Sequence, residues 1–302
     1  MMKSERVEEH GSRRRRSAGE RLLVIYARRF PIRRGKLRII DHLWRTTLIG
    51  DDTHRLATLK YGGFQVPCDL SEMLQRQFYF FGTYFLEEDV LACWQSMAKD
   101  AKVILDVGAN AGIYSLAALA IQREASVHAF EPTPEIAERL RATAESNGLC
   151  TLRVHQVAVL SGEGEAILRR YRGESGNNEG MNFISQDLGK FDGERIQTVC
   201  LDQFCRDHSI AYIDLLKLDV QGHEHSVLRG ARNLLEAGRI GTIFMELNWG
   251  KNSAAVCSAS ESVQLLTQAG YVFSKPGVCL NWARPGGWLR SLSDVVAHRM
   301  QD

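Results

Sequence analysis

The sequence predicts an α/β protein built on a doubly wound, mainly parallel sheet, and three observations lead to this prediction. From residue 101 onward, short apolar segments typical of strands alternate with longer segments typical of helices. A glycine-containing turn, "VGANAG" at residues 107–112, follows the first of these strands, and Glu131 ends the second. Doubly wound sheets bind ligands at the carboxyl ends of their strands, so the turn and Glu131 predict a ligand site there.

The composition is that of a globular protein. The chain has 302 residues, of which 44% are hydrophobic and 25% charged, which allows one large domain or two smaller ones. The longest apolar stretch, 103–121, contains Asp106 and Asn110 and is therefore interpreted as strand, turn and helix rather than as a membrane span. Seven cysteines without a C-x-x-C pair favour reduced thiols and a cytoplasmic protein.

The first 46 residues form a basic arm. They hold 14 Lys and Arg against 5 Asp and Glu, a balance of +9, which leaves 24 against 31, a balance of −7, for the rest. Arg28 and Arg29 stand where a signal peptide would need small residues, so the arm is expected to be retained and partly disordered. Its charge could attract an anionic membrane surface or carrier, or simply keep it solvated. No nucleic-acid-binding signature accompanies it.

Residues 47–100 are expected to form an α/β cap that contributes to the substrate site. The segment 56–70 predicts a hairpin that turns at Tyr61–Phe64. The following "SEMLQRQFYFFGTYF", residues 71–85, predicts a helix capped by Ser71 that carries a dense aromatic cluster.

Residues 101–302 are expected to form the ligand-binding domain, with an insertion at 161–200. The insertion is rich in Gly and Asn, predicts a hairpin, and includes the polar loop 173–182 as the segment expected to move. Apolar runs predict strands at 102–107, 126–130, 152–160, 213–220, 242–247 and 271–274, and helical periodicity predicts helices at 113–122, 134–146, 226–237 and 260–269.

The glycine turn differs from a dinucleotide-binding loop. In a G-x-G-x-x-G fingerprint the middle glycine lets the backbone approach a pyrophosphate, but here that position is Asn110. Glu131, 19 residues after Gly112, could accept both hydroxyls of a ribose. Asp106 could face a cationic amine, or it could brace the turn. A ligand with a ribose, an ammonium group and no phosphates fits better than NAD, and S-adenosylmethionine is such a ligand.

Four stretches, "VILDVGANAGIYSLAAL", "AFEPTPEIAERLRATAESNGL", "QVAVLSGEGEA" and "IDLLKLDVQGHEHSVLRGA", closely resemble the FkbM-like family of S-adenosylmethionine-dependent methyltransferases over residues 101–249. The resemblance implies a class I methyltransferase fold, a Rossmann-like sheet of seven strands with a reversed final strand, and O-methylation of sugar or polyketide hydroxyls. The upstream "QRQFYFFGTYF" looks like the family's aromatic segment. That segment typically ends in Tyr-Glu, whereas here Tyr84-Phe85 is followed by Glu87 two residues later.

The resemblance also implies roles for individual residues. It places Glu131 beside the ribose. It places the adenine near the end of the third predicted strand, around Gln156 to Ala158. The methionine side of S-adenosylmethionine would be lined by Asp106, Gly108, Asn110 and Gly112.

Methyl transfer to oxygen needs alignment and a base, because the sulfonium methyl is already activated and the hydroxyl proton must leave. Asp219, His223 and Glu224 follow the fourth predicted strand, toward which the methyl should point. His223 is suited to accept a proton at neutral pH, although it could instead cap the next helix. Asp219 could orient the hydroxyl or face the cofactor's amine, and Glu224 could favour the helix N-terminus.

Three alternatives stay open. Asp219, Glu246 and Asn248 could together supply oxygen ligands to Mg²⁺, although a metal-free site is favoured. An RNA methyltransferase would use the basic arm, but nucleobase enzymes usually carry an Asn/Asp-Pro-Pro-aromatic element where this chain has 219–222, so nucleic acid is not the expected partner. A non-catalytic nucleoside-binding module would keep the pocket without the chemistry.

Overall fold

The structure is a computed structural model, and it describes residues 17–31, 33–47, 53–170, 172–173, 176–177, 182–185, 187, 192–247, 253–277, 280, 283 and 294–299. By their internal contacts the residues fall into two units, Met1–Thr53 and His54–Asp302. Residues 1–16 of the arm 1–46, which was predicted to be partly disordered, and most of the loop 173–182 lie outside the described residues.

The first unit contains two helices, α1 (Ala18–Arg29) and α2 (Lys36–Thr47). A capping box starts α1, in which the Glu20 amide donates to Ser17 Oγ and the Ser17 amide donates to the Glu20 carboxylate. The ammonium of Lys36 donates to the Ala27 carbonyl at 3.0 Å and ties the helices together. Within the described residues, no helix is both long and apolar enough to cross a bilayer.

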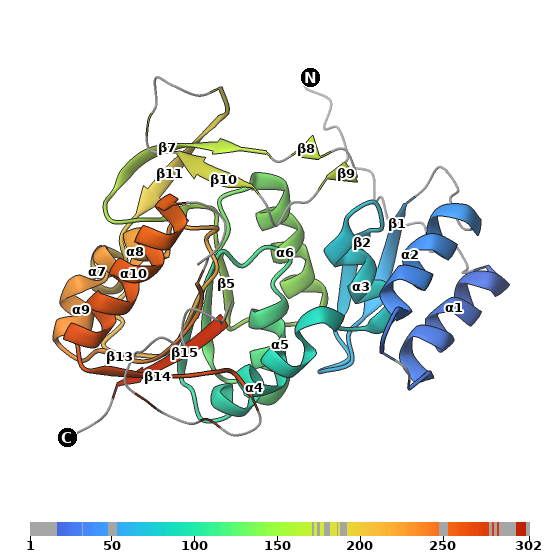
Figure 1. Cartoon of the computed structure of the whole chain (residues 1–302), viewed down its shortest axis with the longest axis horizontal. Helices are drawn as coiled ribbons and strands as arrows, with labels where there is room; N and C mark the ends of the chain where they lie inside the picture. The colour runs from blue at the N-terminus through green and yellow to red at the C-terminus, as the bar shows by residue number, and fades with distance from the viewer. Residues whose placement is uncertain are drawn as a thin grey trace, which may run out of the picture. The chain divides into compact units, whose positions relative to one another are not determined.

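The second unit is built on a seven-stranded sheet of order β14-β15-β13-β12-β3-β4-β5 (Figure 1). Only β15 runs antiparallel to its neighbours, so the reversed strand that the resemblance implied is confirmed. The strands are β3 (Val103–Val107), β4 (Ser126–Phe130), β5 (Leu152–His155), β12 (Ile213–Leu218), β13 (Ile240–Glu246), β14 (Tyr271–Ser274) and β15 (Asp294–Arg299).

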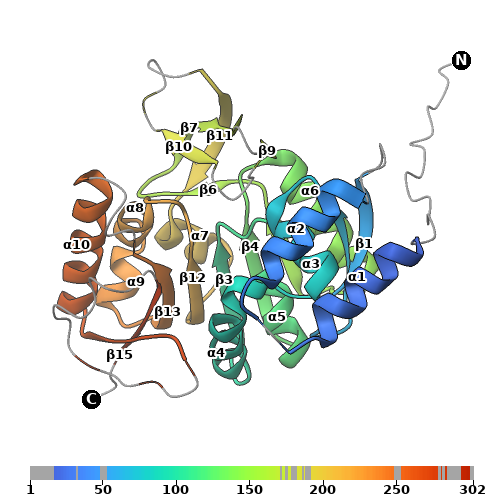
Figure 2. The same ribbon diagram turned by 45° about the vertical axis from the view of Figure 1, so that its right-hand side comes forward.

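Helices cover both faces of this sheet, as a doubly wound fold requires (Figure 2). On one face lie α4 (Glu88–Ala98), α5 (Ile113–Ile121) and α6 (Pro134–Ser146), and on the other α7 (Leu201–Asp207), α8 (Glu224–Arg229), α9 (Arg232–Glu236) and α10 (Ser253–Gln268). The central strands β3, β12 and β13 are almost wholly buried, which explains their continuous apolar runs.

Three of the predicted elements differ clearly from the structure. The helix predicted at 260–269 starts earlier, since α10 spans Ser253–Gln268. The helix predicted at 226–237 is two helices, separated at Gly230 and Ala231. At Gly230 the chain passes so close to Leu160 that an added Cβ would lie 2.3 Å from the Leu160 carbonyl oxygen. The Asp202 carboxylate then caps α9 by accepting from the amides of Asn233 and Leu234, each at 3.0 Å. The strand predicted at 152–160 also divides, and its second half leaves the main sheet.

That second half, β6 (Ala158–Val159), belongs to a four-stranded sheet of order β10-β7-β11-β6 formed by the insertion. The other strands are β7 (Gly164–Arg169), β10 (Phe183–Ser185) and β11 (Glu194–Val199), and two short strands, β8 (Arg172–Gly173) and β9 (Gly176–Asn177), pair beyond them. In Figure 1 the strands β7, β10 and β11 of this insertion sheet lie above the strands of the main sheet.

The segment before β3 contains the predicted hairpin, formed by β1 (His54–Thr58) and β2 (Gln65–Asp69), followed by α3 (Met73–Phe81) and the short 3₁₀ helix η1 (Phe85–Glu87). Ser71 does not cap α3, which begins after Glu72 without a side-chain cap. Asn147, at the end of α6, holds the hairpin through two 2.8 Å bonds with the Gln65 backbone. By its contacts this segment belongs to the same unit as the sheet.

Candidate functional site

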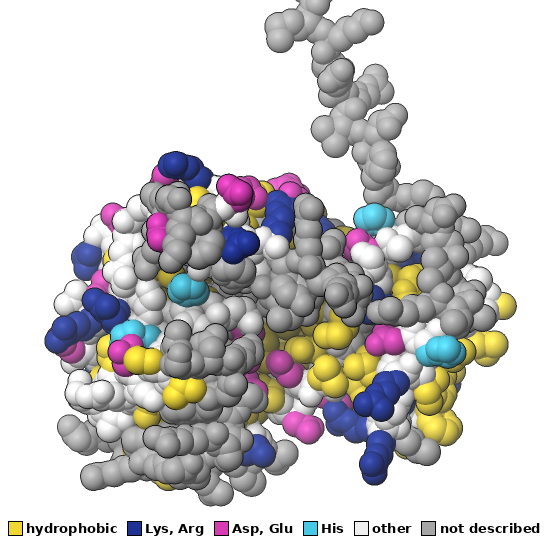
Figure 3. Space-filling model, turned by 45° about the horizontal axis from the view of Figure 1, so that its top comes forward, with side chains coloured by type: hydrophobic (Ala, Val, Ile, Leu, Met, Phe, Trp, Pro, Cys, Tyr) yellow, Lys and Arg dark blue, Asp and Glu magenta, His cyan; other side chains and the backbone are white. Residues whose placement is uncertain are grey.

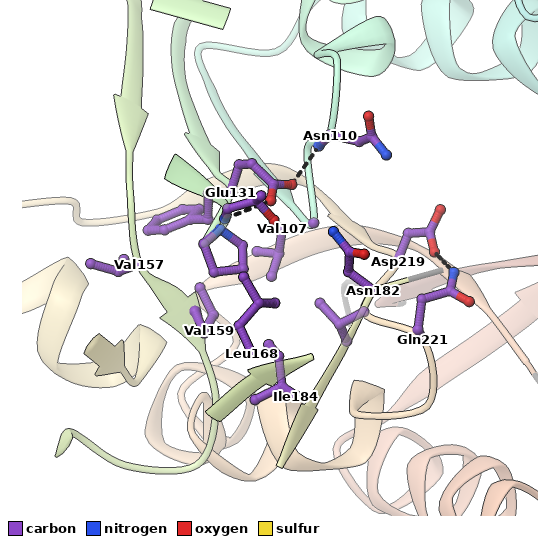
Figure 4. A pocket seen from close by; sticks show the side chains of 16 residues that line it. Val107, Asn110, Glu131, Val157, Val159, Leu168, Asn182, Ile184, Asp219 and Gln221 are labelled. Atoms are coloured by element: carbon purple, nitrogen blue, oxygen red, sulfur yellow. Dashed lines mark hydrogen bonds between the residues drawn. The ribbon is translucent and has the colours of Figure 1, made fainter. Parts of the chain in front are cut away.

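A pocket lies at the carboxyl ends of β3, β4 and β12, where the main sheet meets the insertion sheet (Figure 4). It has roughly 530 Å³ of space between its walls, open solvent included. Side chains from the insertion sheet make one apolar wall, and polar groups from the strand ends make the other (Figure 4). The lining residues are Val107, Gly108, Asn110, Phe130, Glu131, Pro132, Thr133, Val157, Ala158, Val159, Leu168, Asn182, Ile184, Asp219, Val220 and Gln221.

The glycine turn forms the floor of this pocket in a conformation that needs glycine. Gly108 has φ +80°, and a Cβ there would lie 2.0 Å from the Asp219 carbonyl oxygen. Gly112 has φ +77° and presses against the Leu140 side chain. Asn110 also adopts a positive φ of 49°, which asparagine tolerates better than most residues.

All five backbone N–H groups of residues 108–112 donate within the protein. Those of Gly108 and Ala109 reach the Phe130 carbonyl at 3.0 and 2.9 Å, and that of Asn110 reaches Glu131 Oε2 at 3.0 Å. The amide of Ala111 donates to the Asn110 side chain, and that of Gly112 to the Ala109 carbonyl. The turn therefore offers no set of free amides to a phosphate, unlike the nests that cradle phosphoryl oxygens.

Glu131 is held rigidly at the pocket wall. Its Oε1 accepts from the Thr133 amide at 2.9 Å while its Oε2 accepts from the Asn110 amide, which fixes the plane of the carboxylate. The neighbouring Thr133 hydroxyl is buried and finds no hydrogen-bond partner among the described residues.

Of the seven residues predicted for the cofactor, five lie in the pocket lining: Gly108, Asn110, Glu131, Ala158 and Asp219. Gly112 and Asp106 do not line it. Asp106 is buried under the turn, where its Oδ2 accepts from the Ser115 amide at 3.0 Å and from the Ser115 hydroxyl at 2.6 Å. Burial raises the pKa of Asp106. This arrangement braces the start of α5 rather than facing a ligand.

The three residues predicted for catalysis have different hydrogen-bond partners, and only Asp219 lines the pocket. Asp219 lines the pocket and accepts from the Gln221 amide at 2.9 Å. His223 Nε2 lies 2.8 Å from the Ile184 carbonyl, so this nitrogen must carry the proton, and burial lowers the pKa of the ring. Glu224 accepts from the amides of Val220 and Gly222 and so stabilises the turn before α8.

The set considered for Mg²⁺ is only partly described, because Asn248 lies outside the described residues. The Gln221 amide group reaches Asp219 Oδ1 at 2.9 Å and Glu246 Oε2 at 3.5 Å, so an amide joins these two carboxylates. Among the described residues, no three His, Cys, Asp or Glu side chains are arranged to hold a metal ion.

Sequence reasoning missed two contributions to the site. Asn182 and Ile184 of the insertion line the pocket, although their segment gave no sign of doing so. Beside the pocket, the buried Lys217 of β12 lies 3.6 Å from Asp219 Oδ2. In the sequence, Lys217 stands between Leu216 and Leu218 inside an apolar strand. Because charged residues are rarely buried without a partner, this position could have marked Lys217 as a candidate for the site.

Comparison with known proteins identifies relatives of the chain. A protein-family model described as "Methyltransferase FkbM domain" matches residues 106–273. The 2-O-methyltransferase NoeI of Sinorhizobium fredii is 30% identical over 47% of this chain and 63% of its own length. The 31-O-demethyl-FK506 methyltransferase FkbM of Streptomyces tacrolimicus is 32% identical over 45% and 61%. The hexuronic acid methyltransferase AglP of Haloferax volcanii is 24% identical over 60% and 71%. The chain thus covers about two thirds of each of these relatives.

Proposed function

The chain belongs to the FkbM family of methyltransferases, and from this premise we propose that it transfers a methyl group from S-adenosylmethionine to a hydroxyl of a sugar or polyketide-like metabolite. The names of the relatives support this acceptor class, since one is a 2-O-methyltransferase, one acts on 31-O-demethyl-FK506 and one on a hexuronic acid.

The observation that carries the proposal is the glycine turn. Its five amides are all engaged within residues 106–131, so it suits a nucleoside ligand without phosphates. At the same place Glu131 presents a fixed carboxylate, and the Thr133 hydroxyl, which has no partner within the described part of the chain, can bond a ligand. Diol recognition by a carboxylate and the absence of a phosphate cradle together fit S-adenosylmethionine and not NAD.

Each part of the cofactor would bind to pocket residues of matching chemistry. Glu131 would hold the ribose hydroxyls, and the apolar side chains of Val157, Val159 and Leu168 would enclose the adenine. Asp219, at the other end of the pocket, would attract the positive charge of the methionine part. When bound, the cofactor supplies an electrophilic methyl group, and the chain supplies its alignment with the acceptor oxygen.

We also propose that the basic first unit brings the enzyme to an anionic surface or carrier. The first unit exposes Leu22 and Ile25 of α1, Phe30 directly after α1 and Ile39 of α2, each at least 45% accessible. Hydrophobic side chains also gather in patches on the face shown in Figure 3. Exposed apolar groups among arginines are the pattern by which helices bind the interface of an anionic membrane.

The cofactor assignment is tested by calorimetric titration with S-adenosylmethionine and, separately, NAD⁺. We expect binding of the former only, and we expect Glu131→Gln to weaken it about 10- to 100-fold, because a hydrogen bond to a charged group contributes roughly 1.5–3 kcal/mol. The exposed Glu138→Gln, on α6, is the matched control. Equal affinity of Glu131→Gln and the wild type would refute the ribose assignment.

A further inference from the structure

A carboxylate from the segment before the sheet reaches the catalytic end of the main sheet. Glu87, the last residue of η1, accepts a hydrogen bond from the Tyr114 hydroxyl at 2.5 Å. Tyr114 stands in the first turn of α5, directly after the glycine turn. The Trp94 indole donates to the Tyr114 carbonyl at 2.9 Å and fixes that residue from α4. The position of Glu87 is thereby set by the same helix that follows the cofactor loop.

A buried cation connects Glu87 to the pocket. The Lys217 ammonium lies 4.7 Å from the centre of the Tyr114 ring, whose hydroxyl donates to Glu87, and 3.6 Å from Asp219 Oδ2. Lys217 is 3% exposed, and Asp219 lines the pocket. Three elements, η1, α5 and β12, therefore contribute side chains to one continuous polar cluster, which we call the Glu87 cluster: Glu87, Tyr114, Lys217 and Asp219.

The charges in this cluster balance one another. Burial would lower the pKa of Lys217, but four surrounding carboxylates, of which Asp219 acts most strongly, raise it above the usual value. Burial raises the pKa of Glu87 to about 7, although Lys217 and the hydrogen bond from Tyr114 oppose that rise. Asp294 of β15 and Asp219 raise it further, and Tyr84 also faces it. A carboxyl poised at neutral pH is suited to proton transfer.

His223, the base that the sequence suggested, is placed differently. Its Nε2 donates to the Ile184 carbonyl of the insertion sheet, so this nitrogen already carries a proton and cannot accept another. That contact holds β10 against the turn that precedes α8. The geometry favours a role for His223 in seating the insertion, which leaves the proton acceptor to be found elsewhere.

We propose that the Glu87 carboxylate accepts the proton of the acceptor hydroxyl, with Tyr114 and Lys217 as positioning residues. The inference rests on the methyl transfer proposed above. The acceptor oxygen forms its bond to the methyl carbon as the bond from that carbon to sulfur breaks, and the electron pair of the broken bond stays on sulfur. The hydroxyl proton passes to Glu87, which then releases it to water, so that charge and protons balance.

A first test needs neither cofactor nor acceptor. In protein labelled with ¹³C at the glutamate carboxyl, the signal missing from Glu87→Gln is assigned to Glu87 and followed through a pH titration. A midpoint near neutral pH is expected, and Lys217→Met should move it upward because it removes the nearby cation. A midpoint at the ordinary glutamate value, about 4.3, would overturn the proposal.

A second test measures single-turnover methyl transfer to a panel of neutral methyl glycosides as a function of pH. The wild-type rate should rise with pH, reach half of its maximum at about pH 7 and level off above that, because Glu87 must be ionised to act. Glu87→Gln should lose about 10²- to 10⁴-fold in rate together with the rising limb, while S-adenosylmethionine affinity stays the same. Glu87→Asp should recover part of the rate, and Glu88→Gln, an exposed neighbour paired with Lys60, should match the wild type.

The outcomes separate this inference from the proposed function. If the wild type transfers methyl groups and Glu87→Gln shows the same rate and the same rise of the rate with pH, Glu87 is not the base. The methyltransferase proposal then stands. If the limb vanishes in His223→Gln instead, the base is His223. If the wild type binds the cofactor but methylates none of the glycosides, the proposed sugar acceptor is wrong, and the Glu87 assignment falls with it.

Discussion

At the scale of single residues, Gly108 shows how tightly the cofactor loop is fitted to the strand beside it. The residue combines a left-handed backbone with an approach to Asp219 that leaves no room for a side chain. A glycine is needed here for two separate reasons, and each has its own energetic cost on substitution.

Gly108→Ala should therefore destabilise the protein more than an ordinary substitution at positive φ. The left-handed conformation alone costs roughly 1–2 kcal/mol, and displacing the Asp219 carbonyl should add about 1–3 kcal/mol. Gly63→Ala is the matched control, because Gly63 has φ +62° with nothing within 4 Å of an added Cβ. Urea unfolding of both variants measures the difference, and equal losses would show that the loop can move away from β12.

Residues near one another in the sequence were the easiest to place. Gly108 and Asn110 follow a strand directly, and Glu131 ends the next one, so parallel pairing alone predicts that they meet. Glu87 and Lys217 meet Tyr114 only through tertiary packing of three distant segments. No spacing rule connects them, which is why the sequence suggested His223 as the base and gave no role to Glu87.

At the scale of elements, the apolar runs predicted the central strands well because strands buried on both faces need side chains without polar groups. The errors occurred where an element's end depends on a distant partner. The cap that starts α9 comes from Asp202, 31 residues before Asn233, and nothing local announces it. Likewise β6 leaves the main sheet because β11, at the far end of the insertion, pairs with it.

A pair of stacked histidines joins β4 to β5. His128 Nδ1 lies 3.1 Å from His155 Nε2, with the two rings nearly parallel and Phe204 packed edge-on against both. Burial lowers the pKa of each ring from 6.5 to about 4, and the neighbouring basic groups add to this effect.

This pair should make stability depend on pH. The native rings stay neutral where the unfolded chain already binds protons, so the free energy of unfolding should fall as the pH drops from about 6.5 toward 4. His155→Phe, which keeps an aromatic ring between Phe130 and Phe204, should make that fall shallower. The exposed His54→Gln should leave it unchanged. An identical slope for His155→Phe and the wild type would contradict the assignment.

At the scale of the whole molecule, the two signs of charge are segregated along the chain. Residues 1–46 carry a balance of +9 and the remainder −7. An acidic enzyme unit is repelled by an anionic membrane, so only the basic segment can provide electrostatic attraction to one.

We therefore expect the protein to float with vesicles that contain phosphatidylserine and not with neutral phosphatidylcholine vesicles. Binding should weaken as salt rises, since each basic residue near such a surface contributes about 1 kcal/mol that salt screens. Replacing Arg13–Arg16 with Ser should reduce binding, and Leu22→Ser with Ile25→Ser should reduce it further at high salt. Equal flotation with neutral vesicles would rule out an electrostatic attachment.

The insertion sheet leaves and re-enters the fold at adjacent points, because β6 and β11 pair in parallel with Ala158 beside Thr198 and Val159 beside Val199. A segment with neighbouring ends can change in length at little entropic cost, since the entropic cost of closing a loop grows only with the logarithm of the number of residues in it. This segment also lines the pocket through Asn182 and Ile184. Transplanting it between related enzymes should therefore exchange part of the pocket wall as a single cassette, without redesign of the seven strands that carry it.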